Sequence, residues 1–187
     1  MKYKNASMET VDVKIRELLR NSSLTTEEQK FLTTEEQGFL MKKGLFLFGV
    51  TGSGKTYTLY AIKNHFQSFN FQSFNSNSCN VENWVELLTE IKDRIAEKKS
   101  IKYTIEHITG HNFVFLDDVG AEKSTEWVQE TLYLIIDRCY RNEKTLFITT
   151  NLSMEEFSVK YGDRLLSRIC GMCDTYEMPK IDKRVNE

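Results

Sequence analysis

The stretch Gly49–Thr56, GVTGSGKT, has the residue types and spacing of a phosphate-binding loop. It fits the pattern GxxxxGK[ST], whose glycines let consecutive backbone N–H groups turn toward phosphate oxygens. Lys55 would reach the outer phosphates of a nucleotide and the Thr56 hydroxyl would ligand magnesium. An apolar run, Leu45–Phe48, precedes the loop and a helical pattern follows it, which is the context that this chemistry requires. The residues predicted to bind the nucleotide are Gly49, Val50, Thr51, Gly52, Ser53, Gly54, Lys55, Thr56 and Tyr57.

Two carboxylates follow the next clear apolar run, in the stretch NFVFLDDVG at Asn112–Gly120. A buried strand here would deliver Asp117 and Asp118 to the carboxyl edge of a parallel sheet, where ligands bind. We expect Asp117 to hold the magnesium ion, directly or through water, and Asp118 to orient and activate the attacking water. Many sites of this kind have glutamate at the second position, and aspartate is one methylene shorter, so we expect slow hydrolysis.

Further polar groups lie beyond these two motifs. The run TLFITTN ends in Asn151, whose amide could reach the terminal phosphate or the water that attacks it. The stretch GDRLLSRI places Arg164 and Arg168 four residues apart on one helical face. A guanidinium that completes another subunit's phosphate site can raise the rate of phosphoryl transfer, and its fork fits phosphate oxygens. The alternative is that these are surface arginines paired with acidic residues.

From residue 44 onward, apolar runs alternate with helical patterns, which is typical of an α/β fold with a parallel sheet wrapped by helices. The predicted strands are Leu45–Phe48, a weak one at Asn75–Cys79, Phe113–Leu116, Thr145–Thr149 and Thr175–Met178. The predicted helices are Lys55–His65, Val81–Ile95, Glu126–Arg141 and one that starts at the capping box Ser153–Glu156 and runs to Gly162. These elements would bring the motifs together at one edge of the sheet.

The first forty residues differ from the rest. Glu9–Arg20 is a short amphipathic helix by its spacing of apolar residues. After it, TTEEQKFL at 25–32 is followed by TTEEQGFL at 33–40, and FQSFN occurs twice within 66–75. Two short copies are too few for a solenoid, so we interpret both as local duplications without an assigned function.

Composition narrows the classes of protein. A chain of 187 residues with 40% hydrophobic and 28% charged residues is typical of one soluble globular domain. No apolar run approaches the ~18 residues of a membrane span and no secretory signal is visible, so we expect a cytoplasmic protein.

The net charge of −2 excludes a globally basic field, so contact with DNA would need a local patch of basic residues. The candidate residues are Lys92, Arg94, Lys98, Lys99 and Lys102, with Glu86, Glu90, Asp93 and Glu97 interspersed among them.

The ordered series of motifs resembles the DnaC/IstB group of AAA+ ATPases, which is close to the DnaA initiator. The resemblance covers roughly residues 42–178 and extends from KGLFLFGVTGSGKTYTLYAI through NFVFLDDVGAE and LFITTN to GDRLLSRI. It implies Walker A at Gly49–Thr56, Walker B at Asp117 and Asp118, sensor 1 at Asn151, and an arginine finger at Arg168, with Arg164 less closely matched. It also implies binding of ATP or ADP with Mg²⁺.

The resemblance further implies a division into a short helical extension at 1–41, which is a candidate partner-binding segment, and an ATPase domain at 42–187. The chain ends soon after the last predicted strand, so we expect little or no C-terminal lid. Loaders of the DnaC type usually carry a longer N-terminal domain that grips the helicase, whereas about forty residues precede the ATPase core in this sequence.

Several functions are compatible with this reading. The leading one is a helicase-loader-like ATPase, stimulated by DNA or a partner, that assembles with a DnaB-like replicative helicase and single-stranded DNA and self-associates through the arginine finger. An IstB-like transposition helper is the alternative within the same fold. A small-molecule kinase would leave Asn151 and the two arginines without a role. A nucleotide-binding adaptor that never hydrolyses ATP is a further alternative, because position 118 has aspartate where many such sites have glutamate.

Overall fold

The computed structural model describes residues 3–21, 43–68 and 80–181. Within these ranges, five parallel strands form one sheet in the order β2-β3-β4-β1-β5. The strands are β1 (Gly44–Phe48), β2 (Val81–Asn83), β3 (Phe113–Val119), β4 (Thr145–Thr150) and β5 (Cys173–Glu177). The predicted α/β fold with a five-stranded parallel sheet is therefore confirmed. The strand predicted at Asn75–Cys79 lies outside the described residues, and β2 begins shortly after it.

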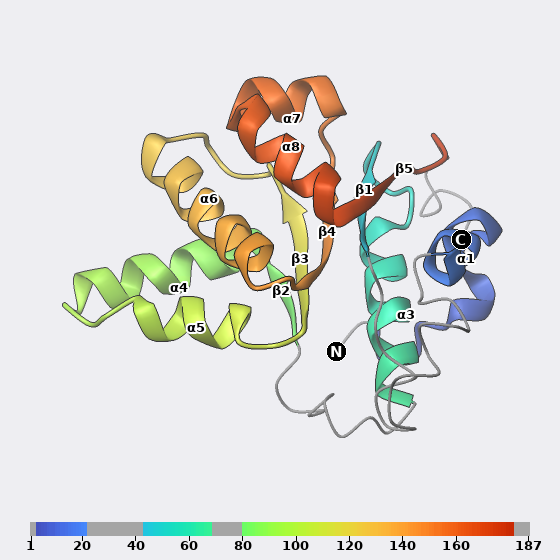
Figure 1. Cartoon of the computed structure of the whole chain (residues 1–187), viewed down its shortest axis with the longest axis horizontal. Coiled ribbons are helices and arrows are strands. Elements are labelled where there is room, and N and C mark those ends of the chain that lie inside the picture. The colour runs from blue at the N-terminus through green and yellow to red at the C-terminus, as the bar shows by residue number, and fades with distance from the viewer. Residues whose placement is uncertain (1–2, 22–42, 69–79, 182–187) are drawn as a thin grey trace.

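Helices cover both faces of this sheet (Figure 1). On one side lie the short 3₁₀ helix η1 (Met8–Thr10), α1 (Val13–Asn21) and α3 (Lys55–Ser68). On the other side lie α4 (Trp84–Ala96), α5 (Lys102–Thr109), α6 (Glu126–Arg141), α7 (Met154–Tyr161) and α8 (Asp163–Met172). None of the helices in the described part of the chain is long and apolar enough to cross a membrane.

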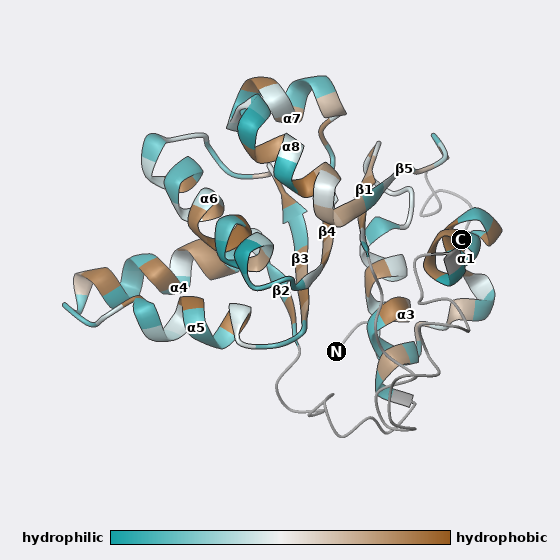
Figure 2. Cartoon of the chain, in the orientation of Figure 1, coloured by the Kyte–Doolittle hydropathy of each residue, from teal (hydrophilic) through white to brown (hydrophobic). Residues whose placement is uncertain are grey.

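The strands β1, β3 and β4 are buried from both sides, which explains why they read as nearly continuous apolar runs. Leu45 and Leu47 pack in one cluster with residues of α1 and α3, whereas Phe46 between them packs with residues of α4 to α8. Phe115 and Leu116 of β3 divide between the two clusters in the same way, because successive side chains of a strand point to opposite faces. Figure 2 shows hydrophobic residues along the strands and polar residues on the outer sides of the helices.

The helix predicted at Val81–Ile95 begins three residues later than expected. Its first three residues form β2, in which Val81 pairs with Phe115. The Asn83 side chain then caps α4 by accepting hydrogen bonds from the backbone of the first helical turn, at 3.1 and 3.2 Å. Val85 and Ile95 share the helical spacing of the buried apolar residues but are 41% and 48% exposed. The buried residues of α4 are Trp84, Leu87, Leu88 and Ile91.

The capping box predicted at Ser153 is confirmed. The backbone N–H of Ser153 donates to Glu156 Oε2 at 2.8 Å, and the backbone N–H of Glu156 donates to Ser153 Oγ at 3.2 Å. This reciprocal pair starts α7 directly after the β4 loop. The helix predicted at Glu126–Arg141 has those bounds in α6, and the helix predicted at Lys55–His65 extends three residues further in α3.

The N-terminal segment packs against α3. The prediction of one helix at Glu9–Arg20 is corrected to η1 followed by α1, and Val13 is 56% exposed while Ile15 is fully buried. The amide of Asn64 on α3 donates to the carbonyl of Ala6 at 2.9 Å. Residues 3–20 therefore contribute to the core on this face of the sheet. The predicted boundary at 41/42 and the duplicated segment at 25–40 lie outside the described residues, so the division into 1–41 and 42–187 stays a prediction.

Candidate functional site

The loop between β1 and α3 has the backbone shape that its glycines allow. Gly49, Gly52 and Gly54 have φ of 130°, 83° and 95°, which residues with a side chain rarely adopt. Gly49 also lies against the end of β5, where an added Cβ would come within 3.2 Å of the carbonyl oxygen of Met178. The three glycines thus set the path of the loop before Lys55 begins the helix.

Lys55 lies over this loop and is only 6% exposed. Its Nζ donates to the carbonyl oxygen of Gly49 at 2.7 Å and to that of Val50 at 2.8 Å. Phosphate oxygens are stronger acceptors for an ammonium group than backbone carbonyls, because they are charged. The side chain is therefore already positioned over the loop where an anionic ligand would replace these contacts.

Asp117 lies at the carboxyl end of β3 and is 6% exposed. Its Oδ1 accepts a hydrogen bond from Thr56 Oγ1 at 3.1 Å and another from Thr149 Oγ1 at 2.6 Å. Burial raises the pKa of Asp117 above its ordinary value, and the neighbouring Asp118 adds to this, while the two hydroxyl groups and Lys55 act in the opposite direction. Carboxylate and hydroxyl oxygens gathered beside the phosphate loop are donors of the type that Mg²⁺ takes.

Replacing Asp117 by asparagine is expected to raise the melting temperature of the nucleotide-free protein near neutral pH. Because the pKa of Asp117 is raised in the folded state, the folded protein binds a proton more readily than the unfolded chain. Stability therefore falls as the pH rises between the unfolded and the folded pKa. Thermal melts from about pH 4 to about pH 8 should show the wild type losing stability relative to the Asp117→Asn variant. Parallel curves over this range would contradict the expected effect.

Asp118 follows with a left-handed backbone, at φ of 60°. Its backbone N–H donates to Thr149 Oγ1 at 2.9 Å, and its Oδ1 accepts a hydrogen bond from Asn151 Nδ2 at 2.6 Å. The structure thus brings together the predicted residues of three motifs: Thr56 of the phosphate loop contacts Asp117 of β3, and Asn151 after β4 contacts Asp118. Asn151 is exposed at this edge of the sheet.

Thr149 is a residue of this site to which the sequence assigned no role. Its hydroxyl donates to Asp117 and accepts from the backbone of Asp118, so it joins both acidic residues to β4. The signal in the sequence is a threonine at the end of the apolar run TLFIT, whose hydroxyl would be buried in a strand. A buried hydroxyl requires a partner, so a threonine beside two aspartates was a candidate for this contact.

Three other residues predicted to bind the nucleotide have different surroundings. Val50 is 42% exposed and Thr51 is exposed at the turn of the loop. Tyr57 instead faces the N-terminal segment, where its hydroxyl accepts from the backbone N–H of Ser7 at 3.2 Å and lies 2.8 Å from Thr10 Oγ1. This contact connects the segment before the first strand to the start of α3.

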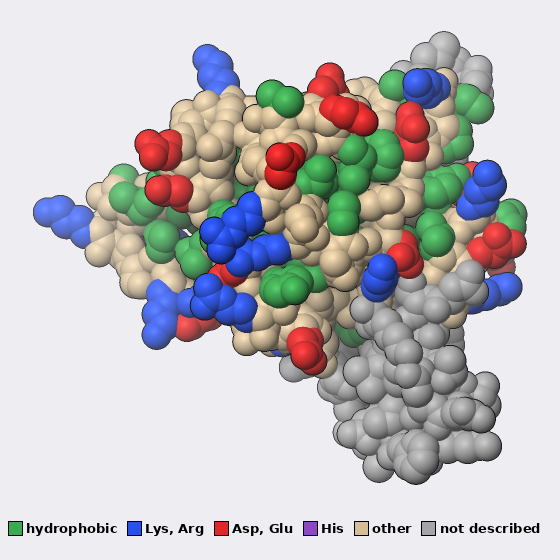
Figure 3. Space-filling model, turned by 45° about the horizontal axis from the view of Figure 1, so that its top comes forward, with side chains coloured by type: hydrophobic (Ala, Val, Ile, Leu, Met, Phe, Trp, Pro, Cys, Tyr) green, Lys and Arg blue, Asp and Glu red, His purple; other side chains and the backbone are tan. Residues whose placement is uncertain are grey.

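The two arginines of α8 have different surroundings. Arg168 is 19% exposed, and its Nη1 lies 2.7 Å from Oδ1 of Asp137, a buried carboxylate of α6 that also pairs with Arg141. The Arg168 guanidinium lies over the ring of Tyr133 at 4.7 Å. Arg164 is exposed and lies over the same ring at 5.5 Å. Figure 3, with the top of the molecule turned forward, shows a group of Lys and Arg side chains left of the centre, beside hydrophobic and acidic ones. Within one molecule, Arg168 is thus engaged by its own protomer and Arg164 is accessible.

The basic residues of α4 and the turn after it are largely engaged by neighbours. Ion pairs join Arg94 to Glu90 at 3.2 Å, Lys99 to Glu97 at 2.7 Å and Lys102 to Glu106 at 3.6 Å. Lys92 lies over the Trp127 ring at 5.2 Å. Local pairing lowers the positive potential of this segment, so DNA contact here stays a prediction.

Comparisons with known proteins agree with this geometry. The model of the bacterial DnaA ATPase domain matches residues 32–173. Two curated proteins of Bacillus subtilis strain 168 are similar to this chain. The replicative helicase loader DnaI is 30% identical over 116 residues, which are 61% of this chain and 35% of DnaI. The phage-like element PBSX protein XkdC is 26% identical over 144 residues, which are 72% of this chain and 49% of XkdC. The chain thus spans less than half of the length of either relative.

Solved structures share the fold. The crystal structure of the DnaC helicase loader has a TM-score of 0.68 at 23% identity and covers 95% of this chain and 98% of the DnaC chain. AMPPCP-bound DnaA from Aquifex aeolicus has a TM-score of 0.69 at 18% identity and covers 94% of this chain and 50% of the DnaA chain. Together with the family match and the confirmed five-stranded parallel sheet, these likenesses agree with the resemblance drawn from the motifs. The chain therefore belongs to the bacterial DnaA ATPase domain family.

Proposed function

We propose that this protein is an ATPase of the helicase-loader type, working in the cytoplasm, whose nucleotide state controls its assembly with a replicative helicase and single-stranded DNA. The observation that carries the proposal is the convergence of the phosphate loop, Asp117, Asp118 and Asn151 at one edge of the sheet, through hydrogen bonds of 2.6 to 3.1 Å. A nucleotide-binding protein needs the loop alone. A hydrolase also needs a group beside the terminal phosphate that can position water.

The residues would divide the chemistry among them. Lys55 would leave the carbonyls of the loop and bind the outer phosphates. Thr56 and Asp117 would hold Mg²⁺, which neutralises charge on the phosphates. Asp118 would accept a proton from the attacking water, while Asn151 keeps the carboxylate turned toward it. The arginines of α8 would act on the nucleotide of an adjacent copy, which makes self-association part of the proposal.

The proposed partners rest on what similar proteins are described as doing. DnaI and DnaC are described as helicase loaders, and one DnaA structure of the same fold contains AMPPCP and single-stranded DNA. A nucleotide-dependent switch between bound and released states would connect those partners to the site described above.

A second candidate is an adaptor that binds ATP without hydrolysing it. It is favoured by the short hydrogen bond from Asn151 to Asp118, which occupies one oxygen of an already short side chain. The two candidates differ in phosphate release and share nucleotide binding.

The test compares the wild type with the Asp118→Asn variant in the presence of Mg-ATP, single-stranded DNA and the replicative helicase of the same organism. We expect the variant to bind ATP as tightly as the wild type and to lose turnover by about 10²- to 10⁴-fold, because only proton transfer is removed. The trapped variant should stay bound to helicase and DNA, as measured by pull-down and fluorescence anisotropy.

Three outcomes would count against the proposal. Tight ATP binding with no phosphate release by the wild type, even with both partners present, favours the adaptor. Recovery of a transposase in place of a helicase favours a transposition helper. Absence of nucleotide binding excludes all of these functions.

A further inference from the structure

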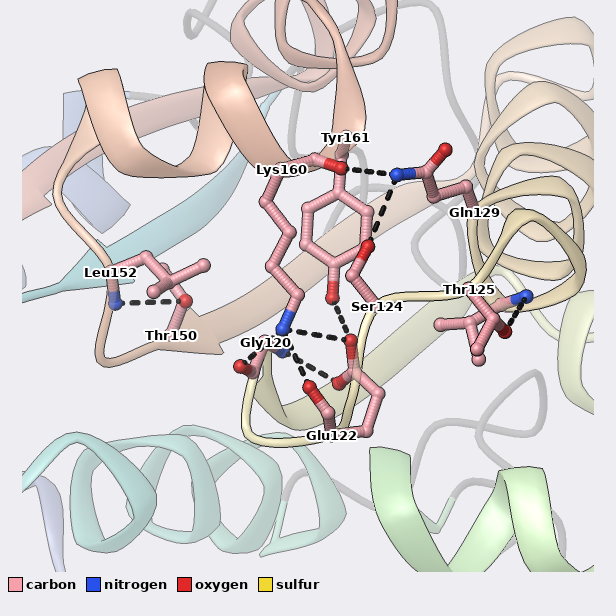
Figure 4. A network of polar contacts seen from close by, with 10 residues as sticks. Gly120, Glu122, Ser124, Thr125, Gln129, Thr150, Leu152, Lys160 and Tyr161 are labelled. Atoms are coloured by element: carbon pink, nitrogen blue, oxygen red, sulfur yellow. Dashed lines mark hydrogen bonds and ion pairs between the residues drawn. The ribbon is translucent and has the colours of Figure 1, made fainter.

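A network of polar contacts holds the loop that follows Asp118 (Figure 4). This loop contains two successive departures from ordinary backbone, at Asp118 with φ of 60° and at Gly120 with φ of 104°. An added Cβ at Gly120 would lie 2.7 Å from Leu152 Cδ1, so the loop also packs closely on the segment after β4. Backbone in such regions persists only where surrounding contacts enforce it.

Lys160, near the end of α7, supplies most of these contacts. Its Nζ donates to the carbonyl oxygens of Gly120 and Glu122, each at 2.7 Å, and lies 3.2 Å from Glu122 Oε1. The side chain is 16% exposed, so these contacts are sheltered from water. All three acceptors belong to the loop after β3, which means that one ammonium group fixes two carbonyls and a carboxylate of that loop.

Glu122 completes the network with both of its oxygens. Oε2 accepts from the backbone N–H of Gly120 at 3.1 Å, and Oε1 accepts from the hydroxyl of Tyr161 at 2.5 Å. Burial by itself would raise the pKa of Glu122, but the hydrogen bonds from Tyr161 and the backbone, together with Lys160, hold it below its ordinary value. The carboxylate therefore stays ionised and keeps its three partners, Gly120, Tyr161 and Lys160, near neutral pH.

The contacts connect two parts of the proposed site. On one side the loop leads back to Asp118, whose carbonyl accepts from the N–H of Ala121 at 3.4 Å. On the other side Lys160 and Tyr161 end α7 directly before Gly162 and α8, which carries Arg164. A shift of the loop would move Asp118 relative to the phosphate loop without touching the residues that bind phosphate.

We propose that Lys160 and Glu122 are positioning residues for hydrolysis, which fix the backbone of residues 118–122 so that the Asp118 carboxylate faces the nucleotide. The proposal rests on the function proposed above. The role of Lys160 and Glu122 differs from that of the phosphate-binding residues. In the network they contact neither Lys55 nor Thr56, and they act only through Asp118.

The experiment measures kcat, KM for ATP, affinity for ATPγS and the melting temperature of Lys160→Met and Glu122→Gln. We expect kcat to fall about 10- to 100-fold, as for other residues that orient a reactive group, with ATPγS affinity unchanged within about twofold. Lys160→Arg, which keeps the charge, should recover part of kcat. Lys123→Met is the matched control, since Lys123 is an exposed residue of the same loop. Tyr161→Phe removes a single hydroxyl and serves if either main variant fails to fold.

Unchanged kcat in folded variants would overturn the proposal, and so would a parallel loss of kcat, affinity and melting temperature, which indicates a purely structural role. A wild type without turnover would defeat the proposed function instead. In that case hydrogen exchange decides the positioning role: residues 118–123 should exchange faster in Lys160→Met while residues 49–56 stay unchanged, and equal exchange in both proteins would overturn it.

Discussion

Lys55→Ala should abolish measurable nucleotide binding at micromolar ATP and remove any turnover. Lys55 is the buried cation of the phosphate loop, and its Nζ already lies within 2.8 Å of two loop carbonyls. Hydrogen bonds to charged groups contribute about 1.5 to 3 kcal/mol each, so losing two contacts to phosphate should weaken ATP binding by about 100-fold or more. Isothermal titration with ATPγS and Mg²⁺ measures this loss directly.

A second Lys55 variant separates the effect of the Lys55 charge on ATP affinity from the effect of its side-chain packing, and a variant elsewhere serves as the control. Lys55→Met keeps most of the aliphatic stem and should show the same loss of affinity, because the missing charge is responsible. Lys123→Ala, at an exposed position of the loop after β3, should bind ATPγS as the wild type does. An unchanged affinity in Lys55→Ala, with the protein folded by circular dichroism, would show that the loop does not bind the phosphates.

The phosphate loop, β1, β3, β4 and α6 could be predicted from the sequence because their signals are local. Glycines, a lysine and a threonine at fixed spacing specify the loop, and β3 is an uninterrupted apolar run that ends in two aspartates. The predicted meeting of Asp118 and Asn151 also followed from local reasoning, since the carboxyl ends of parallel strands share one edge of the sheet.

The errors arose where contacts between distant segments decide the structure. Val81–Asn83 continue the helical spacing of α4, and only the pairing of Val81 with Phe115 makes them a strand. The helix α5 was missed because its eight residues follow a highly charged turn and give too short a periodic signal. The sequence also could not show that Lys160 reaches back 40 residues to Gly120.

Arg168→Ala should destabilise the protein, whereas Arg164→Ala should leave its stability almost unchanged. Arg168 pairs with the buried Asp137 and lies over Tyr133, so its removal leaves a buried carboxylate with Arg141 as its remaining partner. Truncating one partner of a buried ion pair costs about 3 to 5 kcal/mol, and the remaining pair should reduce this to about 2 kcal/mol. An exposed arginine with a single ring contact should cost within about 0.5 kcal/mol. Urea unfolding of both variants measures the difference, and equal stability would contradict the role of Asp137.

This difference affects how an arginine finger is tested, because lost activity in Arg168→Ala would follow from instability as well as from a missing finger. The double variant Asp137→Leu/Arg168→Met removes the ion pair and keeps apolar volume, so its stability should lie within about 1 kcal/mol of the wild type. If Arg168 completes the site of an adjacent copy, this variant should stay inactive although it is folded. Mixing it with Asp118→Asn should then restore part of the turnover, since one interface regains an intact Arg168 and an intact Asp118. A double variant as active as the wild type would assign Arg168 to the structure of its own protomer. The exposed Arg164 would then be the arginine to test in the same complementation.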